Sequence, residues 1–285
     1  GLTLSDTLQN KKVINFFTPD RISSLEQDLT SIIYQLSHKK KTVAILFVMI
    51  FTNSLFAQYM PTKILINNVN IFNGKDNKTV KGNILIEGKL IKTISTEAIA
   101  TDKSGLTKII DGGGKYIIPG LIDNHSHLMF ESIPQMQAMM SDFAFLNLFA
   151  AKASEKQLLR GFTTVRDMGG GSLSLARAID MGLVIGPRVY SSGAFISQTG
   201  GHGDFGLPTD VPRKVGDMSY AERNGMVAVA DGADQVLLRS REQLRQGATQ
   251  LKLMAGGGVA SSYDPLDVMQ YTDQEFKAAV QSAEN

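Results

Sequence analysis

Segments typical of β-strands alternate with segments typical of α-helices from residue 116 to the end of the chain. The strand-like runs are apolar or rich in β-branched residues and lie at residues 116–122, 163–165, 187–195 and 247–258. Helical patterns separate these runs at about residues 135–160, 172–184 and 219–246. Because strands that alternate with helices pair in parallel through crossover connections, this part of the chain predicts an α/β fold.

Two parallel architectures fit this alternation, a doubly wound sheet and the first part of a barrel. Residues capable of chemistry follow the strand-like runs, namely His125, His127, Arg166, Asp167, His202 and Lys252. In barrels such side chains gather at the carboxyl ends of the strands. We therefore predict an incomplete TIM-type (β/α)8 barrel of about four strands over residues 116–285. A further helix is expected after Thr272, which forms a capping-box pattern with Glu275.

The residues before the barrel predict a small β unit. Residues 63–72 and 83–94 are rich in β-branched side chains and are bounded or broken by the turn pairs Asn73-Gly74 and Glu87-Gly88. Such runs favour strands joined in hairpins. We expect part of a β-sandwich domain over residues 59–115.

Residues 39–58 have the order of regions found in a secretory signal peptide. Three lysines precede an apolar run from Val43 to Phe51, and the small residue Ala57 follows a polar break. The run is short for a stable membrane span. We expect Sec-type export to a periplasmic or secreted location, with an N-terminal membrane anchor as the alternative. Residues 1–38, with a predicted helix at 20–36, are either a true extension or sequence upstream of the natural start.

Composition narrows the chemistry. The chain has no cysteine, which excludes disulfides and thiolate metal ligands, so that a metal must be held by histidine, carboxylate or a modified side chain. The formal net charge is +2, and no basic block is interleaved with aromatic residues, which argues against a nucleic-acid partner. Only four histidines are present.

His125 and His127 are candidate metal ligands. Residues i and i+2 at the end of a strand project from the same face, so the two imidazoles can share one ion. An apolar strand, the Pro119-Gly120 break and Asp123 precede the pair, which favours a metal site over two unrelated polar histidines. Asp123 is expected either to support these histidines through hydrogen bonds, which is the slightly favoured interpretation, or to be an ordinary turn residue.

Lys252 lies between Leu251 and Leu253 in an apolar run. Burial lowers the pKa of a lysine and exposes a nucleophilic amine, which can take up carbon dioxide to form a carbamate suited to bridging two divalent ions. A surface lysine or a salt-bridged lysine is the alternative.

Two further features lie near the predicted strand ends. His202, in a glycine-rich loop, either binds a substrate carboxylate or caps the loop. Arg166 and Asp167 are expected to form an internal ion pair. The glycine runs at 112–114, 169–171 and 256–258 match no nucleotide-binding fingerprint and are predicted to be turns.

The run GGGKYIIPGLIDNHSH resembles the opening of the amidohydrolase superfamily. The segments GFTTVRDMGG, SQTGGHGDFG and QLKLMAGGGV are similar to the branch that contains prolidase-like and Xaa-Arg-type dipeptidases, alongside imidazolonepropionase-like proteins. The resemblance covers roughly residues 62–285 and corresponds to the N-terminal part of such proteins.

This resemblance implies a barrel with a β-sandwich beside it and a site for two divalent ions, with zinc as the expected metal. His125 and His127 match the metal ligands of the first strand, and Lys252 matches the carboxylated lysine that bridges the ions. A hydroxide bridging the ions would attack the amide carbonyl of a dipeptide or N-acyl amino acid. His202 is similar in placement to a residue near the substrate's carboxylate.

The sequence also departs from the family pattern. Members carry two more metal-binding histidines and a proton-handling aspartate on later strands, yet no histidine follows His202. We therefore place no catalytic residue within this chain and expect that aspartate beyond residue 285. The 285-residue chain alone is expected to be inactive and prone to aggregate, and the full-length protein to be a possible homo-oligomer. The alternatives are a mononuclear-metal deaminase or cyclic-amide hydrolase of the same superfamily, and an inactive truncated product or exported binding module.

Overall fold

The computed structural model describes residues 2–5, 11–14, 63–102, 107–214, 216–261 and 263–285. The chain divides into two compact units, Gly1–Ile117 and Ile118–Asn285. The predicted signal peptide and the predicted helix at 20–36 lie outside the described residues. Within the described residues, none of the helices combines the length and the apolar character needed to cross a membrane.

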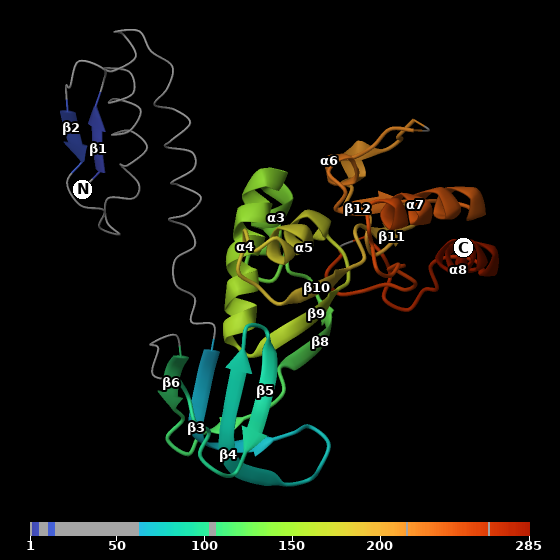
Figure 1. Cartoon of the computed structure of the whole chain (residues 1–285). Helices are drawn as coiled ribbons and strands as arrows, with labels where there is room; N and C mark the ends of the chain where they lie inside the picture. The colour runs from blue at the N-terminus through green and yellow to red at the C-terminus, as the bar shows by residue number, and fades with distance from the viewer. Residues whose placement is uncertain (1, 6–10, 15–62, 103–106, 215, 262) are drawn as a thin grey trace. The chain divides into compact units, whose positions relative to one another are not determined.

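The first unit contains a mixed β-sheet, in which some strand pairs are antiparallel and others are parallel (Figure 1). Its strand order is β5-β4-β3-β6, with β7 also paired to β3. The strands are β3 (Lys63–Phe72), β4 (Thr79–Glu87), β5 (Leu90–Ser95), β6 (Thr107–Asp111) and β7 (Tyr116–Ile117). Val69, Ile71 and Ile84 form its buried cluster. β1 (Leu2–Ser5) and β2 (Lys11–Ile14) pair antiparallel in a separate two-stranded sheet.

The hairpins expected in this unit are present. Gly74 lies between β3 and β4 with a φ of 78°, and Gly88 lies between β4 and β5 with a φ of 60°. Both angles fall in the left-handed region that glycine enters without steric cost, so the sequence signal and the backbone agree at these two turns.

The second unit begins with three parallel strands in the order β10-β9-β8. They are β8 (Leu121–Ser126), β9 (Phe162–Asp167) and β10 (Arg188–Ser191). The crossover from β8 to β9 contains α3 (Gln135–Met140) and α4 (Phe143–Leu159), and the next crossover contains α5 (Leu173–Asp180). These βαβ units confirm the α/β prediction and give the opening strands of an incomplete barrel, whose sheet does not close among the described residues.

The predicted strand from residue 116 is broken at Pro119-Gly120, as expected, and resumes as β8. A Cβ added to Gly120 would lie 2.0 Å from Oγ1 of Thr163 on β9. Glycine at this position therefore allows β8 to approach β9 closely.

The region after β10 differs from the prediction in two ways. β11 (Phe195–Ser197) pairs in parallel with β12 (Val227–Val229), a strand inside the segment 219–246 that was expected to be helical throughout. The helices there are α6 (Tyr220–Arg223) and α7 (Ala233–Arg245), and Gly225 and Gly232 separate β12 from them with φ values of 68° and 85°. Because the apolar Val-Ala-Val run is fully buried, tertiary pairing overrides the helical pattern.

The second difference concerns the strand expected at residues 247–258. It forms no continuous strand, and its only pairing with β11 is one parallel bridge between Leu253 and Ile196. Ile196 N donates to the Lys252 carbonyl at 2.8 Å, and Met254 N donates to the Ile196 carbonyl at 2.9 Å. Beyond Met254 the chain changes partner, because Gly256 forms an antiparallel bridge with Met269.

A short 3-10 helix, η2 (Pro208–Asp210), lies between β11 and α6, and the helix α8 (Asp273–Glu284) follows the bridged segment. Thr272 N donates to Oε2 of Glu275 at 2.7 Å, and the predicted capping box is confirmed. Gly232 N, at the start of α7, donates to Oε1 of the same Glu275 at 2.7 Å, so α8 is tied to α7.

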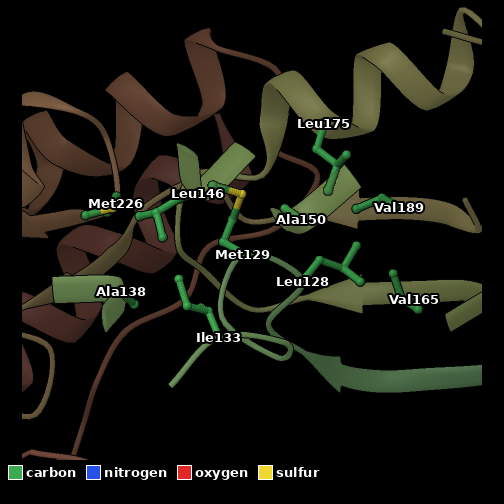
Figure 2. Close-up of a cluster of buried hydrophobic side chains, with 10 residues drawn as sticks. All are labelled: Leu128, Met129, Ile133, Ala138, Leu146, Ala150, Val165, Leu175, Val189 and Met226. Atoms are coloured by element: carbon green, nitrogen blue, oxygen red, sulfur yellow. The ribbon is translucent and has the colours of Figure 1, made fainter. Parts of the chain in front are cut away.

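Buried apolar side chains from β9, β10, helices α3 to α5 and the loop after β8 form one cluster in the second unit, together with Met226 (Figure 2). The cluster consists of Leu128, Met129, Ile133, Ala138, Leu146, Ala150, Val165, Leu175, Val189 and Met226. Leu128 and Met129 follow His127 directly and are almost completely buried. Their burial anchors the backbone that carries the histidine pair.

Candidate active site

His125 and His127 lie next to each other at the carboxyl end of β8. Their ring centroids are 5.3 Å apart, and the rings are inclined by 55°. The intervening Ser126 is buried and donates its hydroxyl to the Glu131 carboxylate. The alternation of a strand therefore brings the two imidazoles together, as the spacing predicted.

The surroundings of both rings favour the neutral imidazole, which is the form that binds metals. Burial lowers the pKa of His127 and outweighs its interaction with the Gly169 backbone, and the neighbouring His125 and Lys252 lower it further. The pKa of His125 is also lowered, mainly by burial and to a smaller extent by the positive charges of Lys252 and Arg166.

One nitrogen of this pair has no protein partner. Nδ1 of His127 is buried and accepts or donates no hydrogen bond among the described residues. A buried polar atom without a partner costs free energy, and in a functional site it marks a place where something outside the chain completes the contact. This observation fits a ring that binds a metal or another ligand.

Lys252 lies close enough to act electrostatically on both histidines. Its pKa is lowered by burial and by the charge of Arg166, and it forms no ion pair within the part of the chain that the structure describes. The structure thus brings His125, His127 and Lys252 into one neighbourhood. No group of three or more histidine, aspartate or glutamate side chains that could hold a metal by itself occurs among the described residues.

Asp123 holds the backbone of this site. Its Oδ1 accepts from the main-chain N–H of His125 at 3.0 Å, and its Oδ2 accepts from Nε2 of Gln157 at 3.4 Å. The carboxylate therefore orients His125 through the main chain, whereas the sequence suggested support of the histidine side chains.

The predicted ion pair between Arg166 and Asp167 is wrong. Arg166 Nε donates to the Asn124 carbonyl at 2.8 Å, while Asp167 is completely buried and accepts from Leu128 N and from the Ser172 hydroxyl, each at 2.7 Å. Consecutive strand residues point to opposite faces, which separates the two side chains.

Asp167 is a site residue whose role sequence reasoning missed. Desolvation raises its pKa from 3.8 to about 6, against the lowering effect of its hydrogen bonds from Ser172, Leu128 and Gly169. Because Leu128 follows His127, the bond from Leu128 N fixes the backbone beside a candidate ligand. The available signal was the position of Asp167 at the carboxyl end of β9.

His202 is held by its own set of partners. Nδ1 lies 2.7 Å from the Ser261 hydroxyl and 3.5 Å from Oδ2 of Asp264, and the main-chain N–H donates to Oε1 of Gln270 at 2.9 Å. A Cβ on Gly258 would lie 2.1 Å from Cε1 of this ring. The glycine run predicted as a turn therefore also makes room for His202.

His127 and His202 line one cavity of about 490 Å³. Most of the remaining lining is apolar and includes Phe130, Ile133, Ala138, Met139, Phe195, Phe205, Leu207, Ala221, Met226, Val227 and Met254. His125 and Lys252 are not among the lining residues. The sequence did not predict this cavity, because its wall is assembled from segments far apart in the chain.

Comparison with known proteins identifies the family. The family model described as Amidohydrolase family matches residues 116–285. The ochratoxinase of Aspergillus niger is 33% identical over 208 residues, which are 70% of this chain and 43% of the enzyme. The adenine deaminase of Clostridium perfringens is 41% identical over a shorter stretch of 70 residues, which are 24% of this chain and 12% of that protein.

Solved structures share the fold. A prolidase complexed with N-methylphosphonate-L-proline is 33% identical with a TM-score of 0.67, and the match covers 78% of this chain and 54% of the prolidase. A Xaa-Pro dipeptidase with bound methionine is 28% identical, with a TM-score of 0.63 and coverage of 78% and 54%. The chain thus spans about half the length of the relatives it matches. On the sequence match and the shared fold, the chain belongs to the amidohydrolase family.

Proposed function

We propose that this protein hydrolyses the amide carbon–nitrogen bond of a dipeptide or N-acyl amino acid with divalent metal ions held at His125, His127 and Lys252. The observation that carries the proposal is the histidine pair at the end of β8, with a buried unpartnered nitrogen on His127 and a desolvated lysine nearby. Similarity to an ochratoxinase, a prolidase and a Xaa-Pro dipeptidase supports an amide or dipeptide substrate.

The donor set fits a metal site. Neutral imidazoles are common ligands of zinc, and the environment keeps both histidines neutral at pH 7. When bound, divalent ions at this place would polarise the amide carbonyl and lower the pKa of water. Three side chains are fewer donors than two ions require, so we expect additional ligands beyond the residues named here.

Lys252 contributes through a carbamate. Its lowered pKa leaves a larger fraction of the amine unprotonated than in an exposed lysine. The amine nitrogen attacks the carbon of carbon dioxide, a proton leaves to solvent, and the product carries one negative charge on two oxygens. That charge replaces a cation beside two imidazoles and supplies oxygen donors for a pair of ions.

His202 is proposed to bind the carboxylate of the substrate. Ser261 and Asp264 hold Nδ1 on one side of the ring. The ring lines the same cavity as His127, so a substrate can contact both. A cavity with mostly apolar walls also excludes water from the bond to be cleaved.

Carbon-13 NMR of the chain equilibrated with labelled bicarbonate tests the carbamate. We expect a carbamate resonance in the wild-type chain that is absent in Lys252→Arg and retained in Lys277→Arg, a change at an exposed lysine on α8. Retention of the signal in Lys252→Arg, or its absence from the wild type with and without zinc, would contradict the role of Lys252.

A mononuclear deaminase is the second candidate, because short stretches of the chain are 40% or more identical to deaminases. It requires one ion and no lysine carbamate. Zinc bound per full-length protein separates the two functions: two ions that fall to one or none in Lys252→Ala support amide hydrolysis, and one ion unaffected by that change supports deamination.

The 285-residue chain alone is proposed to be inactive, because the donors in its described part do not complete a two-metal site. An assay of dipeptides and N-acyl amino acids tests this directly, since turnover by the zinc-loaded chain at the rate of the full-length protein would contradict it. Export through residues 39–58 is a further proposal, which N-terminal sequencing of the mature protein checks.

A further inference from the structure

We infer that the cavity beside His127 binds an aromatic side chain of the substrate. The inference rests on the proposed function, because it takes the cavity to be the place where the substrate of an amide hydrolase lies. It goes further by choosing among the dipeptides and N-acyl amino acids those with a phenylalanine-like group.

The wall of the cavity is suited to an aromatic ring. Four aromatic residues line it, Phe130, Phe195, Phe205 and Tyr220. Phe195 and Phe205 meet edge to face, with centroids 5.9 Å apart and an interplanar angle of 76°. A further ring placed among such rings gains packing beyond the area that it buries.

Three methionines complete this wall, Met139, Met226 and Met254. Met226 and Met254 are buried, and Met139 is partly exposed. Thioethers make favourable contacts with aromatic rings and adapt their shape to the occupant. The combination of rings and thioethers therefore favours an aromatic group over a small or charged one.

Apart from the two histidines, several polar side chains in the lining are already engaged by the protein. The Tyr220 hydroxyl accepts from Phe143 N at 2.9 Å, and Nε2 of Gln135 donates to the Ala260 carbonyl at 2.5 Å. Oδ2 of Asp210 accepts from Leu207 N at 2.8 Å. A charged ligand group would have to compete with these bonds, whereas a hydrocarbon ring would leave them intact.

The loop that forms one side of the cavity is fixed by ion pairs. Arg213 NH1 lies 2.9 Å from Oε2 of Glu222, and its NH2 lies 3.5 Å from Oδ2 of Asp204. All three side chains are largely buried. Because Asp204 and Glu222 flank the loop, the arginine holds its two ends together, and the wall exists before a ligand arrives.

The cavity also has the required size. Its volume of about 490 Å³ falls in the ordinary range for small-molecule sites, which is roughly 300–1,000 Å³. A glycine or alanine side chain would leave most of such a space to water. An N-acyl amino acid with an aromatic side chain occupies much more of it, with its amide beside His127, which lines the same cavity.

Methyl NMR of the metal-free chain labelled at methionine tests the inference. N-acetyl-L-phenylalaninamide is expected to shift the methyl resonances of Met139, Met226 and Met254, assigned by single Met→Leu changes, and to leave Met181 in place. Met181 is exposed and lies outside the lining. N-acetylglycinamide is the matched probe without the ring and is expected to shift none of them.

A pair of charge variants tests the wall. Leu207→Asp places a carboxylate in the lining at a half-exposed position and is expected to weaken binding at least fivefold. Leu238→Asp makes the same change at an exposed position on α7 outside the lining and is expected to have no effect. Circular dichroism confirms that both variants are folded.

Fluorescence anisotropy of N-acetyl-L-tryptophanamide gives a second measurement that does not depend on NMR linewidth, because the chain contains no tryptophan. Equal binding of the glycine and aromatic probes, equal loss in both aspartate variants, or no binding of an aromatic probe in either measurement would overturn the inference. The proposed metal site is tested separately, so zinc binding without binding of the aromatic probe rejects the aromatic pocket and leaves the metal site standing.

Discussion

The two histidines that share the cavity are held in different ways. The ring of His202 is fixed by Ser261 and Asp264, and its main chain by Gln270. The ring of His127 has a buried nitrogen without a partner among the described residues. The chain thus holds Nδ1 of His202 itself and leaves Nδ1 of His127 without a protein partner.

The backbone beside His127 is fixed even though its ring is not. Leu128 N donates to the buried carboxylate of Asp167, and Asp167 also accepts from the Ser172 hydroxyl. The hydroxyl oxygens of Ser172 and Ser191 lie 2.7 Å apart, and Ser191 is the last residue of β10. Hydrogen bonds therefore connect the carboxyl ends of β8, β9 and β10. These hydrogen bonds fix the backbone beside His127 and leave Nδ1 of its ring free to bind a metal. A preorganised metal site needs support of this kind.

Asp167→Ala is expected to have the largest effect, because it would remove that support. It would leave buried donors at Leu128 and Ser172 without an acceptor, at a cost of about 3 kcal/mol in the free energy of unfolding. Urea unfolding followed by circular dichroism measures this cost. Asp267→Ala, at an exposed position, is the control and is expected to change stability by less than about 0.5 kcal/mol.

His127→Ala is expected to lower zinc affinity about a hundredfold or more, as loss of a metal ligand does. His202→Ala removes a histidine from the same cavity and is expected to change zinc affinity by less than about twofold. Competition with a chromophoric chelator measures both values. An equal loss of zinc affinity in the two variants would show that the two histidines do not differ in metal binding.

Asp167 is also expected to make stability depend on pH. Its pKa is about 6 in the folded protein, whereas an aspartate in an unfolded chain has the ordinary value of 3.8. The folded chain therefore binds the proton more tightly than the unfolded chain does. The free energy of unfolding should therefore fall as pH rises from about 4 to 6, by about 2 kcal/mol.

Asp167→Asn lacks this titration and isolates its effect. The stability difference between wild type and variant should shrink by about 2 kcal/mol between pH 4 and pH 7, as urea unfolding at several pH values would show. A difference that is constant across this range would show that Asp167 has an ordinary pKa.

Ser261→Ala is expected to have the smallest effect, about 1 kcal/mol, because it removes one hydrogen bond from the half-buried ring of His202. Thermal unfolding measures the loss. The same variant should leave zinc affinity unchanged, since its contact is with His202 and not with His127.

Local patterns in the sequence were sufficient to predict much of this molecule. The β-hairpins, the βαβ units, the capping box at Thr272 and the proximity of His125 to His127 each depend on residues close together in the chain, and the structure confirms them. The family resemblance is confirmed as well. The metal and substrate roles of His125, His127, Lys252 and His202 stay predictions.

Features that depend on distant residues were missed. The bond from Leu128 to Asp167 spans 39 positions, and that from His202 to Ser261 spans 59. β12 was taken for helix because its burial comes from pairing with β11, which lies about thirty residues earlier. Periodicity carries no information on such pairings, so it also gave no sign of the aromatic and methionine wall.

The central claim is that the histidine pair at the end of β8 binds a divalent metal, and ring-nitrogen NMR tests it most directly. In the chain labelled with nitrogen-15 histidine, zinc is expected to shift the ring nitrogens of His125 and His127 together and to leave those of His202 unchanged. Zinc-induced shifts at His202 with none at His125 and His127 would contradict the account.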